Sequence, residues 1–201
     1  MKILAISCSP RKEGNTVTLL NQALAGAKAD GADVELFSVA GKKIEPCLAC
    51  RACGKEGICA QKDDMQPLYD KILAADGIIF GTPVYFYTMT AQCKAIMDRT
   101  IALNHPDRNM ANKVGGIVVV AGSQGNITAV KDLYFYFVSR QMLAANFISA
   151  YAGAEGDAEK LEKCMKATYD LGRVMVALVK MNFKYPLDLM GRAIAYGTHT
   201  K

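Results

Sequence analysis

The sequence predicts a doubly wound α/β domain built on a parallel sheet. Three short runs, residues 3–6, 77–81 and 114–121, are apolar without alternation, which is typical of parallel strands covered on both faces. Each run is followed by a loop containing serine, threonine, glycine or proline, and then by apolar residues at helical spacing. Because strands and helices alternate, we expect a ligand outside the carboxyl ends of the strands.

The remaining elements fit a single domain. A chain of 201 residues with 51% hydrophobic content can fill one core, and no linker divides it. Residues 41–64 form a cysteine-rich insertion after the second strand, and residues 181–201 form a C-terminal tail without clear periodicity. The other expected elements are strands at 34–39 and 147–151 and helices from about 15 and at about 65–75, 89–103, 127–142 and 155–180, with Asp63 or Asp64 capping the helix at 65–75.

Composition narrows the class of protein. No segment is apolar and long enough for a membrane helix, and the chain begins at once with a strand, so we expect a cytoplasmic protein without signal peptide or anchor. The net charge is +5, but lysine and arginine are scattered, which favours acidic small molecules or acidic redox partners over nucleic acid. Four of the seven cysteines lie close together between residues 47 and 59, which favours metal or redox chemistry over a disulfide scaffold.

The loop after the first strand has the donors that a phosphate monoester needs. Ser9 and Thr16 supply hydroxyls, Asn15 an amide and Arg11 a guanidinium, and the helix start adds unpaired backbone N–H groups. The chain has neither the P-loop pattern nor the glycine pattern of dinucleotide folds. A mononucleotide phosphate is therefore the ligand that this loop favours.

Two further loops complete the expected ligand site. Residues 82–88 are aromatic and turn-forming, and they can supply a flat apolar wall for a planar ring. Residues 122–126 follow the third buried strand, where Ser123 and Gln124 can hydrogen-bond the polar edge of a ring. No side chain is assigned as a general acid or base.

The cysteine run is the sharpest chemical signal in the chain. Cys47, Cys50 and Cys53 are spaced by three, so a helical turn opened by Pro46 would direct their thiols to one side, and Cys59 completes the set. Four thiolates suit a [4Fe-4S] cluster or a tetrahedral zinc ion. Because the run follows the second strand, we expect it at the same edge of the sheet as the three loops, where it can approach the ligand of its own or of a partner subunit.

These motifs resemble those of the flavodoxin-like NADPH-dependent FMN reductase family. The resemblance rests on residues 9–16, on Gly81-Thr-Pro-Val-Tyr85, and on Asp98-Arg99 after a helix. It implies five parallel strands in the order 2-1-3-4-5 and bound FMN. The implied contacts are Ser9, Arg11, Asn15, Thr16 and Val17 to the phosphate, Thr82, Pro83, Val84, Tyr85 and Phe86 to the ribityl chain and ring, and Ser123, Gln124 and Gly125 to the ring edge.

The cysteine run also resembles that of the iron-sulfur flavoproteins, a branch of the same family. This resemblance implies a [4Fe-4S] cluster on Cys47, Cys50, Cys53 and Cys59 that exchanges single electrons with FMN. The electron donor and acceptor would be NAD(P)H, a ferredoxin-like carrier or a quinone. Two alternatives stay open, namely a cluster-free NAD(P)H-dependent FMN or quinone reductase and a zinc-stabilised binding module without redox activity.

The expected helix at 127–142 indicates self-association. Its residues 133–138 are apolar or aromatic on every side, and such a helix is rarely left in water. We therefore expect a homodimer or homotetramer.

Overall fold

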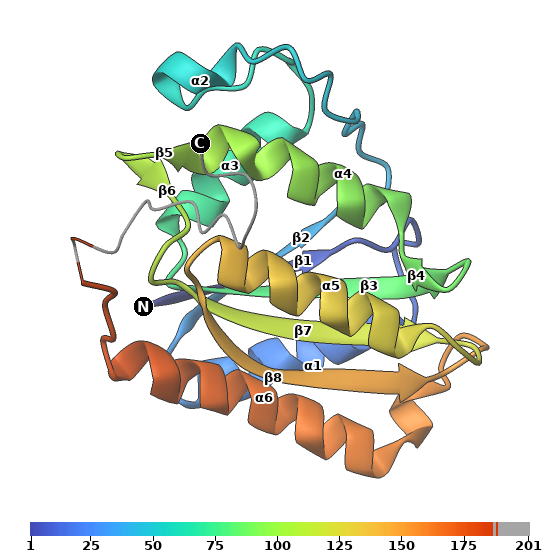
Figure 1. The fold of residues 1–201 in the computed structure, drawn as a ribbon. Coiled ribbons are helices and arrows are strands. Elements are labelled where there is room, and N and C mark those ends of the chain that lie inside the picture. The colour runs from blue at the N-terminus through green and yellow to red at the C-terminus, as the bar shows by residue number, and fades with distance from the viewer. Residues whose placement is uncertain (187, 189–201) are drawn as a thin grey trace.

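The structure, a computed structural model, describes residues 1–186 and 188; the rest of the predicted tail lies outside the described residues. Its centre is a sheet of five parallel strands in the order β2-β1-β3-β7-β8, which confirms the predicted fold and strand order (Figure 1). The strands are β1 (Lys2–Ser7), β2 (Asp33–Ser38), β3 (Gly77–Tyr85), β7 (Val114–Ala121) and β8 (Leu143–Tyr151).

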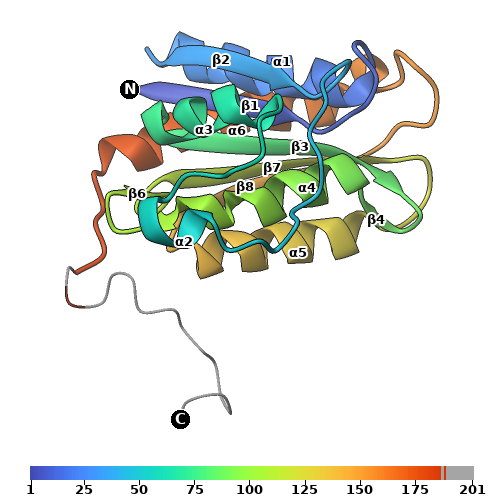
Figure 2. The same ribbon diagram turned by 90° about the horizontal axis from the view of Figure 1, so that it is seen from above.

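Helices cover both faces of the sheet. Helices α1 (Asn15–Ala29) and α6 (Glu162–Lys180) lie on one face, and α3 (Met65–Ala74), α4 (Ala91–Arg99) and α5 (Asn126–Ser139) lie on the other (Figure 2). Residues 3–6 of β1 have no exposed surface, and they divide alternately between the two cores. Burial on both faces is thus the physical reason for the unbroken apolar run in the sequence.

Helix α1 is held against the sheet by a close contact with α6. A Cβ atom placed on Gly172 of α6 would lie 1.8 Å from the carbonyl oxygen of Ala23, and one on Gly26 of α1 would lie 1.9 Å from the carbonyl oxygen of Tyr169. The two backbones therefore touch because both positions lack a side chain. This contact fixes the axis of α1, and with it the loop before the helix.

Several element boundaries differ from the sequence prediction. Strand β3 continues to Tyr85 because it forms an antiparallel hairpin with β4 (Thr88–Met89). Helix α4 begins at Ala91, not at residue 89, because the Thr90 side chain caps it by accepting the N–H of Cys93 at 3.2 Å. The expected helix at 155–180 is interrupted, since Gly156 has a φ of 79° and only the short turn η2 (Ala158–Lys160) precedes α6.

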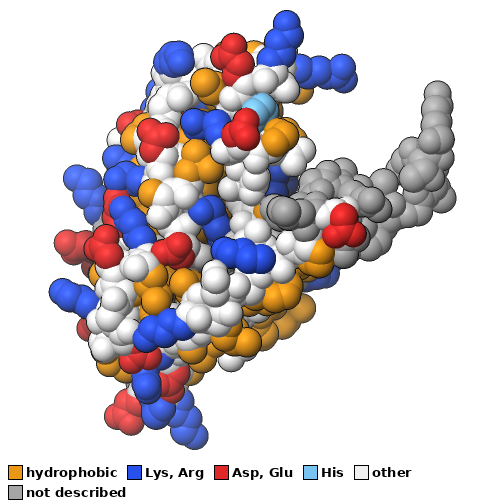
Figure 3. Space-filling view, turned by 90° about the vertical axis from the view of Figure 1, so that its left-hand side faces the viewer, with side chains coloured by type: hydrophobic (Ala, Val, Ile, Leu, Met, Phe, Trp, Pro, Cys, Tyr) orange, Lys and Arg blue, Asp and Glu red, His pale blue; other side chains and the backbone are white. Residues whose placement is uncertain are grey.

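Smaller elements connect these layers. Helix α4 ends in the 3₁₀ turn η1 (Thr100–Leu103), and a two-stranded hairpin of β5 (Asn104–His105) and β6 (Arg108–Asn109) follows. Strand β8 begins at Leu143, four residues before the expected start. Among the described helices, none is both long and apolar enough to cross a membrane. Charges of both signs are mixed on the face at the amino ends of the strands (Figure 3).

The cysteine-rich insertion lies after β2, as predicted, but it does not stay at the carboxyl edge of the sheet. From β2 the chain crosses over α4 toward the opposite end of the molecule, forms the short helix α2 (Cys53–Glu56), and returns to α3 (Figures 1 and 2). The expected position beside the three ligand loops of the same chain is therefore wrong.

The contact between α1 and α6 gives a stability prediction. We expect Gly172→Ala to lower the free energy of unfolding by about 1–3 kcal/mol, because the added methyl overpacks a backbone contact. Urea unfolding followed by circular dichroism measures the change.

The matched control is Gly54→Ala in α2, where a Cβ would meet no atom within 4 Å. It should leave stability unchanged or raise it by up to about 1 kcal/mol, as alanine does in an open helix. Equal stability of the two variants would contradict the close contact.

Candidate functional site

Loops after four strands meet in one cleft at the carboxyl edge of the sheet. The first part of the cleft, with a volume of about 110 Å³, lies between the start of α1, the end of β3, the end of β7 and the chain after β8. Its lining residues are Ser9, Arg11, Gly14, Asn15, Thr16, Pro83, Val84, Tyr85, Val120, Ala121, Gly122, Ala152 and Gly153. Seven of the predicted contact residues thus come together, although they are separated by up to 76 positions in the sequence.

The α1 end of the cleft offers positive electrostatic potential. The first helical bond runs from the Thr18 N–H to the Gly14 carbonyl at 3.0 Å, so the amides at positions 15–17 have no partner within the helix. Arg11 is the one charged residue of this lining, and Ser9 accepts the Arg11 N–H at 3.2 Å, which leaves the Ser9 hydroxyl proton for a ligand. A dianion is the ligand that this arrangement suits.

The Asn15 side chain has a different task from the expected one. Its amide donates to the carbonyls of Ala152 at 3.2 Å and Ala154 at 2.7 Å, and its oxygen accepts the N–H of Ala158 at 3.1 Å. The side chain therefore ties the chain after β8 to the start of α1. Toward a ligand, Asn15 offers its backbone N–H.

Two facing glycines keep the middle of the cleft open. A Cβ atom on Gly122 would lie 4.0 Å from the Cα of Gly153, and the reverse distance is the same. Neither glycine has a positive φ, so the backbone conformation does not require glycine at these positions. The lack of a side chain, which leaves space in the cleft, is the feature that distinguishes them. A longer side chain at either position would fill part of this space.

A second cavity of about 380 Å³ continues the cleft outward. It is lined by Val84, Phe86, Tyr87, Gly122, Ser123 and Gln124, so the aromatic loop at residues 82–88 and the loop after β7 share one cavity. Phe86 is 95% exposed, its ring lies 5.7 Å from that of Tyr87, and both residues are left-handed, with φ of 48° and 72°. Such conformations cost energy in residues with side chains and concentrate at ligand sites.

Three predicted contact residues do not line the cleft. The Thr82 side chain is fully buried, where it accepts the Thr90 N–H at 3.1 Å and donates to the Pro83 carbonyl at 2.9 Å. Val17 lies in the first turn of α1, where its backbone N–H is the available group. Gly125 lies against the backbone of Tyr87.

The structure adds lining residues that were not among the predicted contacts. Gly14, Tyr87 and Gly122 lie within the predicted loops, whereas Val120, Ala121, Ala152 and Gly153 lie outside them. Gly153 could have been found, because it follows the fifth strand and the rule applied to the other strands also applies there.

The cysteine segment forms a second candidate site. A cavity of about 410 Å³ is lined by all four cysteines of the run, together with Leu48, Ala49, Arg51, Ala60, Gln61, Asp98, Arg99, Ile101 and Ala102. The predicted helical turn after Pro46 is wrong, because residues 42–51 are neither helix nor strand and Ala49 and Arg51 have φ of 52° and 58°. A helix begins only at Cys53.

The thiols share a cavity without yet forming a ligand set. Cys47 and Cys50 are exposed, Cys53 is half-buried and Cys59 is buried. Burial raises the pKa of the Cys53 thiol, and the nearby charges of the other three thiolates raise it further. Among the described residues, no three histidine, cysteine or acidic side chains are close enough to hold a metal ion. The donor chemistry of four thiols fits a cluster, and ligation would require these thiols to come closer together.

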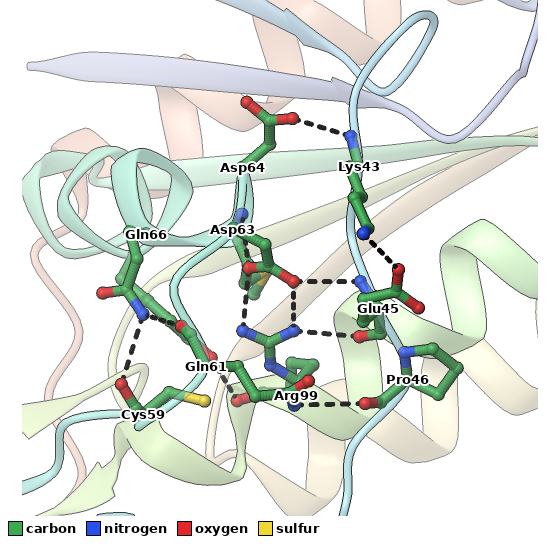
Figure 4. Close-up of polar contacts among 11 residues, drawn as sticks. Lys43, Glu45, Pro46, Cys59, Gln61, Asp63, Asp64, Gln66 and Arg99 are labelled. Carbon is green, nitrogen blue, oxygen red and sulfur yellow. Dashed lines mark hydrogen bonds and ion pairs between the residues drawn. The ribbon is translucent and has the colours of Figure 1, made fainter.

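A buried ion pair fixes the position of this segment (Figure 4). Arg99 donates to both Asp63 oxygens, at 2.8 and 3.0 Å, and to the carbonyl of Glu45 at 2.9 Å. The Asp63 carboxylate also accepts the N–H of Glu45 at 2.9 Å and that of Met65 at 3.1 Å. Of the two predicted caps of α3, Asp64 occupies the N-cap position without a side-chain bond to the helix, and Asp63, one residue earlier, supplies the bond to Met65. Burial opposes ionisation of Asp63, but these hydrogen bonds outweigh it and lower the pKa of the carboxyl.

Comparison with known proteins agrees with this architecture. The family model of NADPH-dependent FMN reductases matches residues 1–156, which include every loop of both sites. An iron-sulfur flavoprotein of Methanocaldococcus jannaschii is 36% identical over 191 residues, covering 90% of this chain and 98% of that protein.

Two solved structures show the same fold. A flavone reductase has a TM-score of 0.68 at 24% identity and covers 90% of this chain, which spans 63% of the reductase chain. A flavodoxin from the domain Archaea has a TM-score of 0.60 at 18% identity, covering 90% of this chain and 99% of the flavodoxin. At these identities the likeness concerns the fold alone, which is flavodoxin-like.

The glycine pair in the cleft gives a binding prediction. We expect Gly153→Val to weaken FMN binding by roughly 1–3 kcal/mol, since its side chain fills the space facing Gly122. Quenching of flavin fluorescence during titration of the FMN-free protein measures the affinity. Ala154→Val, at an exposed neighbour outside the cleft lining, should bind FMN as the unchanged protein does. Equal affinities of the two variants would place FMN elsewhere.

Proposed function

The chain belongs to the NADPH-dependent FMN reductase family and to its iron-sulfur flavoprotein branch, and is thus an FMN-dependent oxidoreductase. From this premise we propose that it passes electrons from NAD(P)H or a reduced carrier to an acceptor through FMN and a [4Fe-4S] cluster. The observation that carries the proposal is the convergence of the phosphate loop, the aromatic loop and the loop after β7 on one cleft.

The residues of the cleft divide the work of holding FMN. The phosphate would lie at the start of α1, where Arg11, the Ser9 hydroxyl and the backbone amides at positions 15–17 are available. The ribityl chain and ring would lie along Pro83, Val84 and Tyr85, with Phe86 and Ser123 to Gly125 toward the ring edge. When bound, FMN accepts electrons as a hydride and releases them one or two at a time.

The four cysteines would hold the cluster, which supplies a one-electron station. The support is chemical, because four thiols line one cavity. The backbone of the segment that carries them is already held by the Asp63–Arg99 ion pair. Thiolate ligation of iron in a cell requires a reducing compartment, and the seven cysteines are free, so we infer a cytoplasmic location.

The open outer cavity suits a planar electron donor or acceptor. Phe86 and Tyr87 stand exposed beside it, and aromatic faces stack on nicotinamide or quinone rings. We therefore propose NAD(P)H or a quinone at this position, with a ferredoxin-like carrier as the partner of the cysteine site.

A second candidate function is a cluster-free NAD(P)H-dependent FMN or quinone reductase. The observation that favours it is that Cys47 and Cys50 are exposed. Among the described residues, their thiols do not form a group that could hold a metal ion. The zinc-stabilised module without redox activity loses its support, because the family to which the chain belongs consists of FMN reductases.

Anaerobic purification separates these functions. We expect stoichiometric FMN together with iron in the unchanged protein, and loss of iron with retention of FMN in Cys50→Ser, because the two sites share no residue. Absorbance spectra and iron, zinc and flavin assays give the contents.

The matched control is Cys164→Ser, which alters a thiol on α6, far from the cysteine run in the sequence. Its iron content should equal that of the unchanged protein. Stoichiometric FMN without iron in anaerobic, reconstituted protein would establish the cluster-free alternative.

We also propose that the chain forms a homodimer or homotetramer. Helix α5 leaves Ile127, Phe135 and Val138 exposed, at 70%, 67% and 45%, although its other face packs into the core. Phe147 and Tyr151 are exposed on the neighbouring edge strand β8. An apolar surface that spans a helix and a sheet edge is typical of an interface.

Sedimentation tests this association. We expect a dimer or tetramer at micromolar concentration, and a shift toward monomer in Phe135→Asp because a charge would be buried in the interface. Asn21→Asp, on the exposed side of α1 at the opposite face of the sheet, should keep the assembly of the unchanged protein. A monomer in the unchanged protein, or no shift in Phe135→Asp, would contradict the proposal.

A further inference from the structure

Arg99 and Asp63 join the two ends of the cysteine segment. Glu45 lies two residues before Cys47, and Asp63 lies four residues after Cys59. Arg99 binds both, through the Glu45 carbonyl at 2.9 Å and the Asp63 carboxylate at 2.8 Å. The Glu45 N–H also donates to Asp63 at 2.9 Å, so the loop that carries all four thiols is closed at its base.

The Arg99 guanidinium is buried, unlike the other charged groups that line the cysteine cavity. The Arg99 side chain has 0% exposure and that of Asp63 has 7%, whereas Arg51 and Asp98, which also line the cavity, are exposed. Burying an ion pair removes the stabilisation of both charges by water. The attraction between the two charges and the hydrogen bonds that they make must offset this cost. The field of Arg99 is therefore poorly screened toward the cavity.

One donor of Arg99 is not used within the described part of the chain. The Arg99 Nε atom is buried and has no hydrogen-bond partner there. Arg99 and Cys59 line the same cavity, and Figure 4 shows the Cys59 sulfur directed to the side on which Arg99 lies. A buried, unpaired N–H is costly, and a sulfur ligand would satisfy it.

We propose that Arg99, held by Asp63, is a positioning residue for the iron-sulfur cluster that also raises the cluster's reduction potential. The proposal rests on the proposed function, since it concerns the cluster of that function. Reduction adds one electron and breaks no bond, so the cluster gains one negative charge. A guanidinium, which stays protonated in proteins, favours that reduced state. The Asp63 carboxylate opposes this effect, so the two partners should shift the potential in opposite directions.

Two substitutions separate this role from a merely structural one. Arg99→Gln removes the cation and should lower the reduction potential. Asp63→Asn keeps the cation and removes its counter-charge, so it should raise the potential. Both should weaken the hold on iron, with affinity lower by about 10- to 100-fold, as changes to residues that support metal ligands do. Loss of structure alone would not give opposite signs.

The experiment is a mediated dithionite titration followed by electron paramagnetic resonance, with iron per FMN measured after a chelator challenge. Bound FMN reports that each variant is folded, because its cleft shares no residue with the cysteine cavity. Arg99→Lys keeps the charge but has fewer donors than arginine. Compared with Arg99→Gln, it should therefore bring the potential close to that of the unchanged protein, while iron is still lost more easily to the chelator. Lys94→Gln, which alters an exposed ion pair with Asp98 on the same helix, is the matched control and should change neither.

The outcomes are distinct. Opposite shifts of potential in Arg99→Gln and Asp63→Asn support the inference. If Arg99→Gln does not fold, a raised potential in Asp63→Asn beside an unshifted potential in Arg99→Lys supports it, and an unshifted potential in Asp63→Asn overturns it. Unchanged potentials, or shifts of the same sign, overturn it while leaving the proposed function intact. An unchanged protein that takes up no iron after anaerobic reconstitution contradicts the cluster of the proposed function, and this inference with it.

Discussion

The pairing of β1 with a parallel strand on each side is the constraint from which the architecture follows. Ser7, at the end of β1, lies opposite Ser38 at the end of β2 and opposite Gly81 of β3, so β1 and β2 end level while β3 continues to Tyr85. The Cys8 N–H then bonds to the Gly81 carbonyl at 2.7 Å, which extends the pairing into the loop. The loop after β1 therefore leaves the sheet beside the last residues of β3, and the start of α1 and the end of β3 line the same cleft. The cleft is a consequence of strand register and not of any single residue in it.

The cysteine segment depends on a different interaction. It has little regular structure, so no ladder of backbone hydrogen bonds fixes its path. Arg99 supplies this order instead, because a buried guanidinium must find acceptors and the nearest are Asp63 and the Glu45 carbonyl. The segment thus takes its frame from α4. The cleft is built by the sheet, whereas the path of the cysteine segment depends on this ion pair and on side-chain hydrogen bonds such as that of Gln66 to the Cys59 carbonyl.

The sequence predicted what depends on local pattern and missed what depends on distant partners. Continuous apolar runs located the three central strands, and the order of the loops placed the cleft. Asn15 looked like a ligand donor, but its amide is taken by carbonyls 137 and 139 residues away. Pro46 is a residue that often opens helices, yet its neighbour Glu45 is held by Asp63 and Arg99, 18 and 54 residues away, and the turn does not form. Asp98-Arg99 was recognised as a motif, but periodicity could not reveal the partner of Arg99.

Helix α4 connects the two sites and also keeps them apart. At its start, Thr90 donates to the Cys8 carbonyl at 2.9 Å, next to the phosphate loop, and at its end Arg99 binds Asp63 at 2.8 Å. A rise of 1.5 Å per residue makes its nine residues about 14 Å long. The Thr90 contact beside the phosphate loop and the Arg99 contact beside the cysteine segment are therefore about one helix length apart. Both sites reach the surface, since Cys47 and Cys50 are exposed at the cysteine cavity and Phe86 is exposed at the cleft. The self-association proposed above would therefore be the way to bring the cavity of one chain to the cleft of another, because α4 fixes the distance between its two ends within one chain.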